Sequence, residues 1–264
     1  MHKLSIAMSM TVIYSDLGDV DCSCLPLLWK DIEGVKVVTL SVDSEVTRRE
    51  VMEAVAAEDD TVLLCGHGTP DGLLGYICDE VEEEDEPEPE FYVDWDKTHY
   101  NDGNRDMDVS DFINKVDEMD ESKEGWEPTG AHRGSEDRPA PQKRIVKEMT
   151  YNTAVDWDML KDTLHAKRII GVWCHASSFA EEHSLPGFWT SMFISNRGEA
   201  RYYGFDNVSN QVIVDELIRF CMDVNELIKK NVPQDQWVKR IVAHGHMNIP
   251  TTKYNYGGLR YYPR

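Results

Sequence analysis

Positively charged residues are scarce in this sequence. Lysine and arginine together number 27, against 49 aspartate and glutamate residues, and the formal net charge is −22. Nucleic acids and anionic membrane surfaces are polyanions, so this charge argues against both as partners. The excess is concentrated in one stretch, because 79–124 holds 20 acidic and 4 basic residues. We therefore expect an acidic, partly flexible insertion at about 79–150.

Long apolar runs are also missing. No stretch approaches the roughly 20 residues that span a bilayer, which predicts no membrane contact. The mildly apolar segment 4–14 is diluted by Ser5, Ser9 and Thr11, so we do not interpret it as a signal peptide. The six cysteines lack zinc-finger or Cys-x-x-Cys spacing. This usage suits a reducing compartment, and we expect a cytoplasmic protein without a resident metal ion or cofactor. The cysteines stand at positions 22, 24, 65, 78, 174 and 221.

Several common site motifs are absent. The sequence contains no G-x-S-x-G elbow, no P-loop and no G-x-G-x-x-G fingerprint, and its acidic run lacks EF-hand spacing. His244 and His246 could bind zinc, but no further cysteine or carboxylate stands at a supporting spacing. A turn at a helix end is the favoured interpretation, and a zinc hydrolase that uses both histidines remains an alternative.

Two short apolar runs that are present end in chemically reactive side chains. The first, at 61–68, reads TVLLCGHG and places His67 between two glycines. The second, at 168–174, reads RIIGVWC and ends at Cys174. If these runs are parallel neighbouring strands, both carboxyl ends open onto one crevice, where ligands bind in open α/β sheets. His67 and Cys174 are then expected to face each other.

The rest of the pattern predicts a single α/β domain over 1–264 with a mostly parallel sheet in a three-layer α/β/α sandwich. The segment 188–194 fits either a strand or a helix, and the aromatic tail 254–264 is expected to wrap an edge. The insertion is expected to contain an edge strand at 91–95 and an amphipathic helix within 107–121. Strands are predicted at 10–14, 35–42, 61–65, 168–174 and 199–205, and helices at 25–30, 47–58, 155–166, 177–183, 208–231 and 234–243.

Cys174 and His67 suit thiolate chemistry. A reactive cysteine needs a polar, electropositive position, and a histidine to handle protons. A helix expected directly after Cys174 would favour the thiolate and a developing oxyanion. The alternative is that Cys174 is a small core residue and His67 a turn residue. Their matching positions at two strand ends favour the functional interpretation. His175 is expected to point away from Cys174, because adjacent strand residues face opposite sides.

Two motifs resemble those of the caspase-like cysteine peptidases, which include caspases, metacaspases, gingipains and clostripain. CGHG at 65–68 resembles the SGHG-type histidine motif, and CHAS at 174–177 resembles the CHSG around the metacaspase nucleophile. The resemblance implies a caspase-like sheet, a peptide or protein substrate, Cys174 as nucleophile and His67 as its proton-handling partner. It also implies an oxyanion hole made by the backbone N–H groups of Gly68 and Cys174.

The sequence departs from the family pattern at Val172. Metacaspases and clostripain carry an aspartate two positions before the nucleophile, which helps receive a basic P1 side chain. Asp16 and Asp206, at the ends of two predicted strands, are candidate substitutes, and each is also a common turn residue. The P1 preference therefore stays open, as does the oligomeric state.

Two further alternatives remain from the sequence. The basic segment 124–147, with Arg133, Arg138, Lys143, Arg144 and Lys147, is either a processing site or a surface loop without that role. The whole chain is either a peptidase or a catalytically inactive caspase-like scaffold whose acidic insertion binds a basic partner.

Overall fold

The computed structural model describes residues 9–18, 22–57, 59–84 and 143–264. The chain divides into two compact units, one made of 1–81 with 147–264 and the other of 82–146. The main sheet, the helices that cover it and the site described below belong to the first unit. The edge strand expected at 91–95, the helix expected within 107–121, and Arg133 and Arg138 lie outside the described residues.

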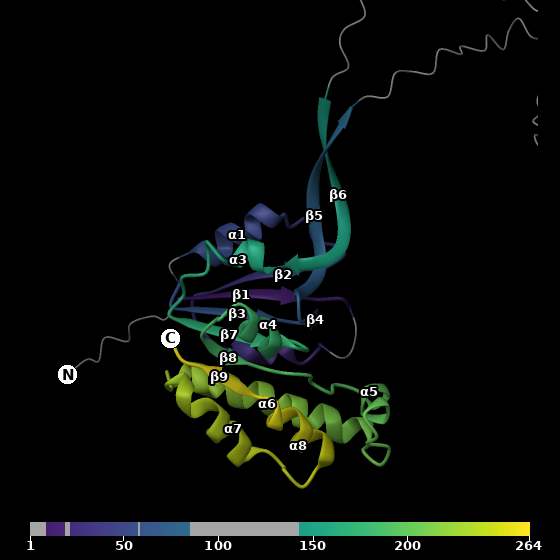
Figure 1. Cartoon of the computed structure of the whole chain (residues 1–264), viewed down its shortest axis with the longest axis vertical. Coiled ribbons are helices and arrows are strands. Elements are labelled where there is room, and N and C mark those ends of the chain that lie inside the picture. Colours follow the sequence, from purple (N-terminus) through teal and green to yellow (C-terminus); the bar gives the residue numbers. More distant parts are fainter. Residues whose placement is uncertain (1–8, 19–21, 58, 85–142) are drawn as a thin grey trace, which may run out of the picture. The chain divides into compact units, whose positions relative to one another are not determined.

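The first unit is built on a six-stranded sheet that is mostly parallel (Figure 1). Five strands pair in parallel, and the last, at one edge, is antiparallel to its neighbour. The mixed α/β class with a mostly parallel sheet is thus confirmed, and the aromatic tail supplies the antiparallel edge strand. In spatial order the strands are β2 (Val35–Leu40), β1 (Met10–Ser15), β3 (Thr61–Cys65), β7 (Arg168–Val172), β8 (Gly187–Trp189) and β9 (Arg260–Tyr262).

Helices pack on both faces of this sheet (Figure 1). Alternate strand residues point to opposite faces, so Leu63 of β3 joins one core cluster and Leu64 the other. The arrangement is compatible with an α/β sandwich. The first face is covered by η1 (Leu25–Trp29), α6 (Asn210–Lys229), α7 (Trp237–His244, preceded by η2, Gln234–Gln236) and α8 (Pro250–Gly257), and the second by α1 (Arg48–Ala56), α3 (Trp157–Leu160) and α4 (Ala176–Glu182).

A second, three-stranded sheet contains β4 (Gly68–Thr69), β5 (Gly72–Glu84) and β6 (Lys143–Val155), in that order. The sequence interpretation assigned 79–84 and 143–150 to the insertion and predicted no strand there, whereas the structure has β5 and β6 running into both segments. The two strands are separated by 58 residues of chain, 85–142. Their pairing leaves no local signal in the sequence, because the acidic composition of 79–84 by itself favours solvent.

Two other elements differ from their predictions. The segment 199–205 was expected to be a strand, but α5 (Arg197–Tyr202) occupies it. The Asn196 side chain starts this helix by accepting a hydrogen bond from Glu199 N at 2.9 Å. The helix expected over 155–166 is reduced to α3, because Val155 still belongs to β6 and the Asp156 side chain caps α3 at Met159 N.

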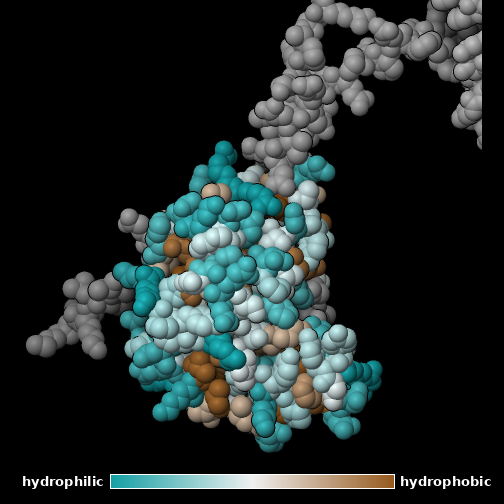
Figure 2. Space-filling model, viewed as in Figure 1, coloured by the Kyte–Doolittle hydropathy of each residue, from teal (hydrophilic) through white to brown (hydrophobic). Residues whose placement is uncertain are grey.

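Apolar side chains are concentrated inside the described part of the molecule. In Figure 2 the visible surface of these residues is mainly hydrophilic, and hydrophobic residues form small separate patches. None of the helices within the described ranges has the length and apolar character to cross a bilayer.

A polar cluster inside the C-terminal part ties α6 to α8 and to the turn before it. The Glu216 carboxylate is buried, with 7% of the residue exposed. It receives hydrogen bonds from His246 Nδ1 (2.8 Å), Arg219 Nε (3.2 Å) and Thr252 Oγ1 (3.2 Å). Burial alone would raise the pKa of Glu216, but the hydrogen bonds from His246 and Arg219 bring it below its ordinary value.

We expect Glu216→Gln to lower the free energy of unfolding at pH 7 by about 1–3 kcal/mol, because a charged acceptor with several donors is lost. A folded-state pKa below the unfolded value means that this stabilisation is complete above about pH 4.3 and is lost as the pH falls further. Thermal unfolding measured from pH 7 to pH 3 should show the two proteins converging at low pH. Asp215→Asn, at an exposed position on the same helix, is the control. Equal stability of Glu216→Gln and the wild type at pH 7 would contradict this account.

Candidate active site

Strands β3 and β7 bring the two predicted site residues to the same rim of the sheet. They pair in parallel from Thr61 opposite Arg168 to Cys65 opposite Val172. One more hydrogen bond, from Gly66 N to Val172 O at 3.1 Å, continues the pairing beyond the strands. The chains then separate, and His67 and Cys174 emerge from adjacent strand ends, as the sequence predicted.

Trp173 connects the loop after β3 to the loop after β7. Its indole Nε1 donates to Thr69 O at 3.1 Å. A Cβ on Gly68 would lie 2.0 Å from the Trp173 ring, and a Cβ on Gly66 would lie 2.5 Å from the Cβ of Ser15. Gly66 also has a φ of 140°, which other residues rarely adopt. The glycines beside His67 therefore make room for neighbouring parts of this chain.

The backbone before Cys174 is held by a buried threonine. The Thr190 hydroxyl accepts a hydrogen bond from Trp173 N (3.1 Å) and donates one to Trp173 O (2.8 Å). Thr190 O also accepts from Ser177 N in the first turn of α4, at 2.7 Å. Thr190 is fully buried, so these bonds are shielded from water and fix the backbone on both sides of Cys174.

Cys174 differs from the other five cysteines in exposure. None of the six forms a disulfide; five are buried, whereas Cys174 is half-buried. Burial raises the pKa of the Cys65 thiol far above its ordinary value, which makes that thiol inert. The backbone turns into α4 at His175, whose φ of 69° is left-handed. The helix expected directly after Cys174 is therefore present.

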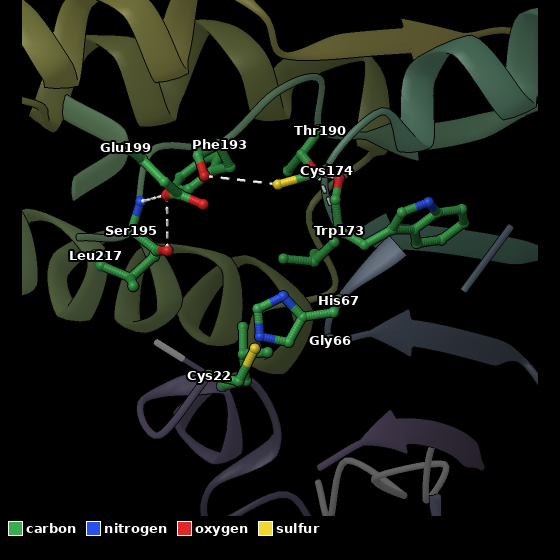
Figure 3. A pocket seen from close by; sticks show the side chains of 12 residues that line it. Cys22, Gly66, His67, Trp173, Cys174, Thr190, Phe193, Ser195, Glu199 and Leu217 are labelled. Carbon is green, nitrogen blue, oxygen red and sulfur yellow. Dashed lines mark hydrogen bonds between the residues drawn. The ribbon is translucent and has the colours of Figure 1, made fainter. Parts of the chain in front are cut away.

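The Cys174 sulfur and the His67 ring line a common cleft. This cleft has a volume of about 460 Å³. A smaller cavity of about 40 Å³, the inner cavity, is lined by both residues as well. Figure 3 shows the inner cavity, with Cys174 at one side and His67 across from it. The Cys174 thiol donates to Phe193 O at 3.7 Å. Asn255 holds the adjacent Ile194 backbone through bonds to its N (2.8 Å) and its O (3.0 Å).

Of the other residues considered for the site, some line the cleft and some do not. Gly68 lines the cleft. Asp16 follows β1, but its carboxylate accepts a hydrogen bond from Gly18 N at 3.0 Å and lines neither cavity. Asp206 is exposed and follows α5 rather than a strand, so its predicted position at a strand end was wrong. His175 lines the cleft together with Cys174; strand alternation does not apply to it, because β7 ends at Val172.

Glu199 is a cleft residue that the sequence reasoning missed. It lines both cavities together with Cys174 and His67. Its position in the first turn of α5 follows from the Asn196 cap. The pattern Asn-x-x-Glu at 196–199 is a signal for a helix start, but this signal was outweighed by the aromatic residues that follow and that favour a strand.

The two histidines considered for zinc pair with separate carboxylates. His244 Nδ1 lies 3.3 Å from Asp223 Oδ1, whereas His246 Nδ1 lies 2.8 Å from Glu216 Oε1. Within the described ranges, no group of three or more His, Cys, Asp and Glu side chains is arranged to hold a metal ion. His246 takes part in the Glu216 cluster instead, and His244 ends α7.

Comparison with known proteins gives no relative: no family model, no curated protein and no solved structure matches this chain.

We expect Thr190→Val to destabilise the protein by about 1–3 kcal/mol, because it removes the partner of the buried Trp173 N–H. The Trp173 C=O loses one of its two donors and keeps Ala176 N, at 3.3 Å. The change keeps the shape of the side chain and removes only the hydroxyl. Chemical denaturation measures the loss, and Thr190→Ser, which keeps the hydroxyl, is the matched control. If Val and Ser variants had the same stability, the hydroxyl bonds could not be what fixes this backbone.

Proposed function

We propose that this protein is a cysteine endopeptidase of caspase-like fold. The observation that carries the proposal is that the half-exposed thiol, Cys174, shares a cleft with His67. The five other thiols of the chain are buried, so a peptide could reach Cys174 most readily. The six-stranded, mostly parallel sheet and the two motifs at its rim also support the family suggested by the sequence resemblance.

The proposed reaction proceeds through a covalent acyl-enzyme. The sulfur of Cys174, as thiolate, attacks the carbonyl carbon of the scissile peptide bond, and the carbonyl π-electron pair moves to oxygen. The backbone N–H groups of Gly68 and Cys174 stabilise this oxyanion. The tetrahedral intermediate collapses, the C–N bond breaks, and the imidazolium of His67 gives its proton to the leaving amine. Water then hydrolyses the thioester, with neutral His67 accepting a proton from it, and releases the free carboxylate and the thiol.

A second candidate function is a catalytically inactive scaffold with the same fold. The observation that favours it is the hydrogen bond from the Cys174 thiol to Phe193 O, at 3.7 Å. In this hydrogen bond the thiol donates to a backbone carbonyl oxygen, which is not a base that could take up its proton. The two functions predict different reactivity of Cys174, and one experiment separates them.

We expect a set of peptidyl acyloxymethyl ketones, with every residue type represented at P1, to alkylate Cys174 selectively. Intact mass and peptide mapping should show one adduct on the wild type and none on Cys174→Ala. Cys78→Ala removes a thiol that is buried elsewhere and should label like the wild type. Cleavage of the best matching peptide should fall by at least about a thousandfold in Cys174→Ala, as expected when a covalent nucleophile is deleted.

His67→Ala should lower the rate of labelling and of cleavage while leaving thermal stability close to that of the wild type, because the His67 side chain lies at the cleft surface rather than in the core. Labelling that is absent with every P1 residue, or equal at several cysteines, would reject the peptidase in favour of the scaffold. Cleavage that survives in Cys174→Ala would reject the assignment of the nucleophile.

A further inference from the structure

The Glu199 carboxylate is a negatively charged group on the wall of the cleft. One of its oxygens, Oε2, accepts hydrogen bonds from Ser195 N (2.8 Å) and Ser195 Oγ (3.0 Å). The other oxygen, Oε1, has no hydrogen-bond or ion-pair partner among the described residues, and the residue is half-buried. Ser195 therefore fixes the orientation of the carboxylate and leaves one oxygen available.

In the described part of the protein, neither cavity that Glu199 lines includes a lysine or an arginine. Burial raises the pKa of the neighbouring Tyr203, and negative charges, including those of Cys174 and Glu199, add to the effect. A cation from outside would be favoured at this place.

The walls of the cleft suit a long side chain with a charged end. Met192, Leu74 and Tyr203 line it together with Glu199 and His67, and such surfaces pack against methylene groups. A cleft of about 460 Å³ lies within the size range of small-ligand sites. Figure 3 shows the Glu199 carboxylate on the same side of the inner cavity as the Cys174 sulfur, with His67 opposite.

We propose that Glu199 is a specificity-determining residue that binds the cationic side chain of a lysine or arginine at P1. The ammonium or guanidinium group pairs with the available carboxylate oxygen, and its stem packs on Met192 and Tyr203. This proposal rests on the proposed peptidase function, which supplies the scissile bond at Cys174. It gives Glu199 the role that the sequence analysis offered to Asp16 and Asp206, neither of which lines the cleft.

The test compares substrates that differ only in charge. Two fluorogenic peptides carry arginine or citrulline at P1; citrulline has nearly the same shape as arginine but is neutral. The wild type should cleave the arginine peptide with a kcat/KM at least about tenfold above that of the citrulline peptide, since charge-assisted pairing is lost with citrulline. Glu199→Gln should lower kcat/KM for arginine by about 10- to 100-fold and leave that for citrulline within about threefold.

Glu199→Gln separates charge from structure. Glutamine keeps an oxygen that can accept the two hydrogen bonds from Ser195, so the loop at 195–199 retains its support. Asp206→Asn removes the same charge from the exposed turn after α5. Its arginine-to-citrulline ratio should stay within about twofold of the wild type, because Asp206 lines neither cavity and an exposed charge is screened. Glu199→Asp keeps the charge and should recover part of the preference for arginine.

The possible negative results distinguish the role of Glu199 from the peptidase function. A wild type that cleaves neutral or acidic P1 residues best overturns the assignment of Glu199 while the peptidase function stands. Equal losses for arginine and citrulline in Glu199→Gln also overturn it, because they indicate a structural role. If no peptide is cleaved, calorimetry of the two peptides with the wild type and with Glu199→Gln decides: a preference for arginine that Glu199→Gln abolishes supports the cation site and rejects only the peptidase.

Discussion

The parallel pairing of β3 with β7 is the constraint on which the site depends. His67 and Cys174 are more than a hundred residues apart in sequence, and the register of Cys65 opposite Val172 makes them neighbours at one rim. A slip of two residues would move one chain end by about 7 Å along the sheet. A slip of one would turn the buried side chains of β7 toward the wrong core. Hydrophobic burial on both faces of the sheet therefore fixes the relative positions of His67 and Cys174, although these two side chains contribute little to that burial.

Beyond the strand ends, the positions of the two loops depend on specific side-chain contacts. Trp173 packs on the backbone of Gly68 and donates to Thr69 O, while Thr190 engages the backbone of Trp173 itself. The same residue thus orients the loop of the histidine and the loop of the cysteine. Preorganisation of this kind is what a covalent mechanism needs, because small displacements of reacting groups reduce rates strongly. These contacts hold the backbone around Cys174, whose sulfur lies at the cleft.

The sequence was sufficient for the parallel core because its strands are continuous apolar runs, which are typical of strands buried on both faces. It was also sufficient for His67 and Cys174, because chain order and strand ends determine their position. It was not sufficient for β5 and β6, whose pairing joins segments far apart in the chain. It failed at Glu199 because local β-propensity of the aromatic residues competed with a short capping signal at Asn196. A residue assigned to the wrong element could not be placed at the cleft.

The distribution of the cysteines has a practical consequence for handling this protein. The five buried thiols lie in the sheet, in α6 and beside the helices that cover the core, and the sixth stands at the cleft. A thiol reagent therefore meets one fast site in the native state, and slow sites that react only when the fold opens. In the time course of modification, the fast phase measures the reactivity of Cys174, and the slow phase measures how often the core opens. The native cysteines can therefore be used to follow unfolding, and no cysteine has to be introduced by mutation.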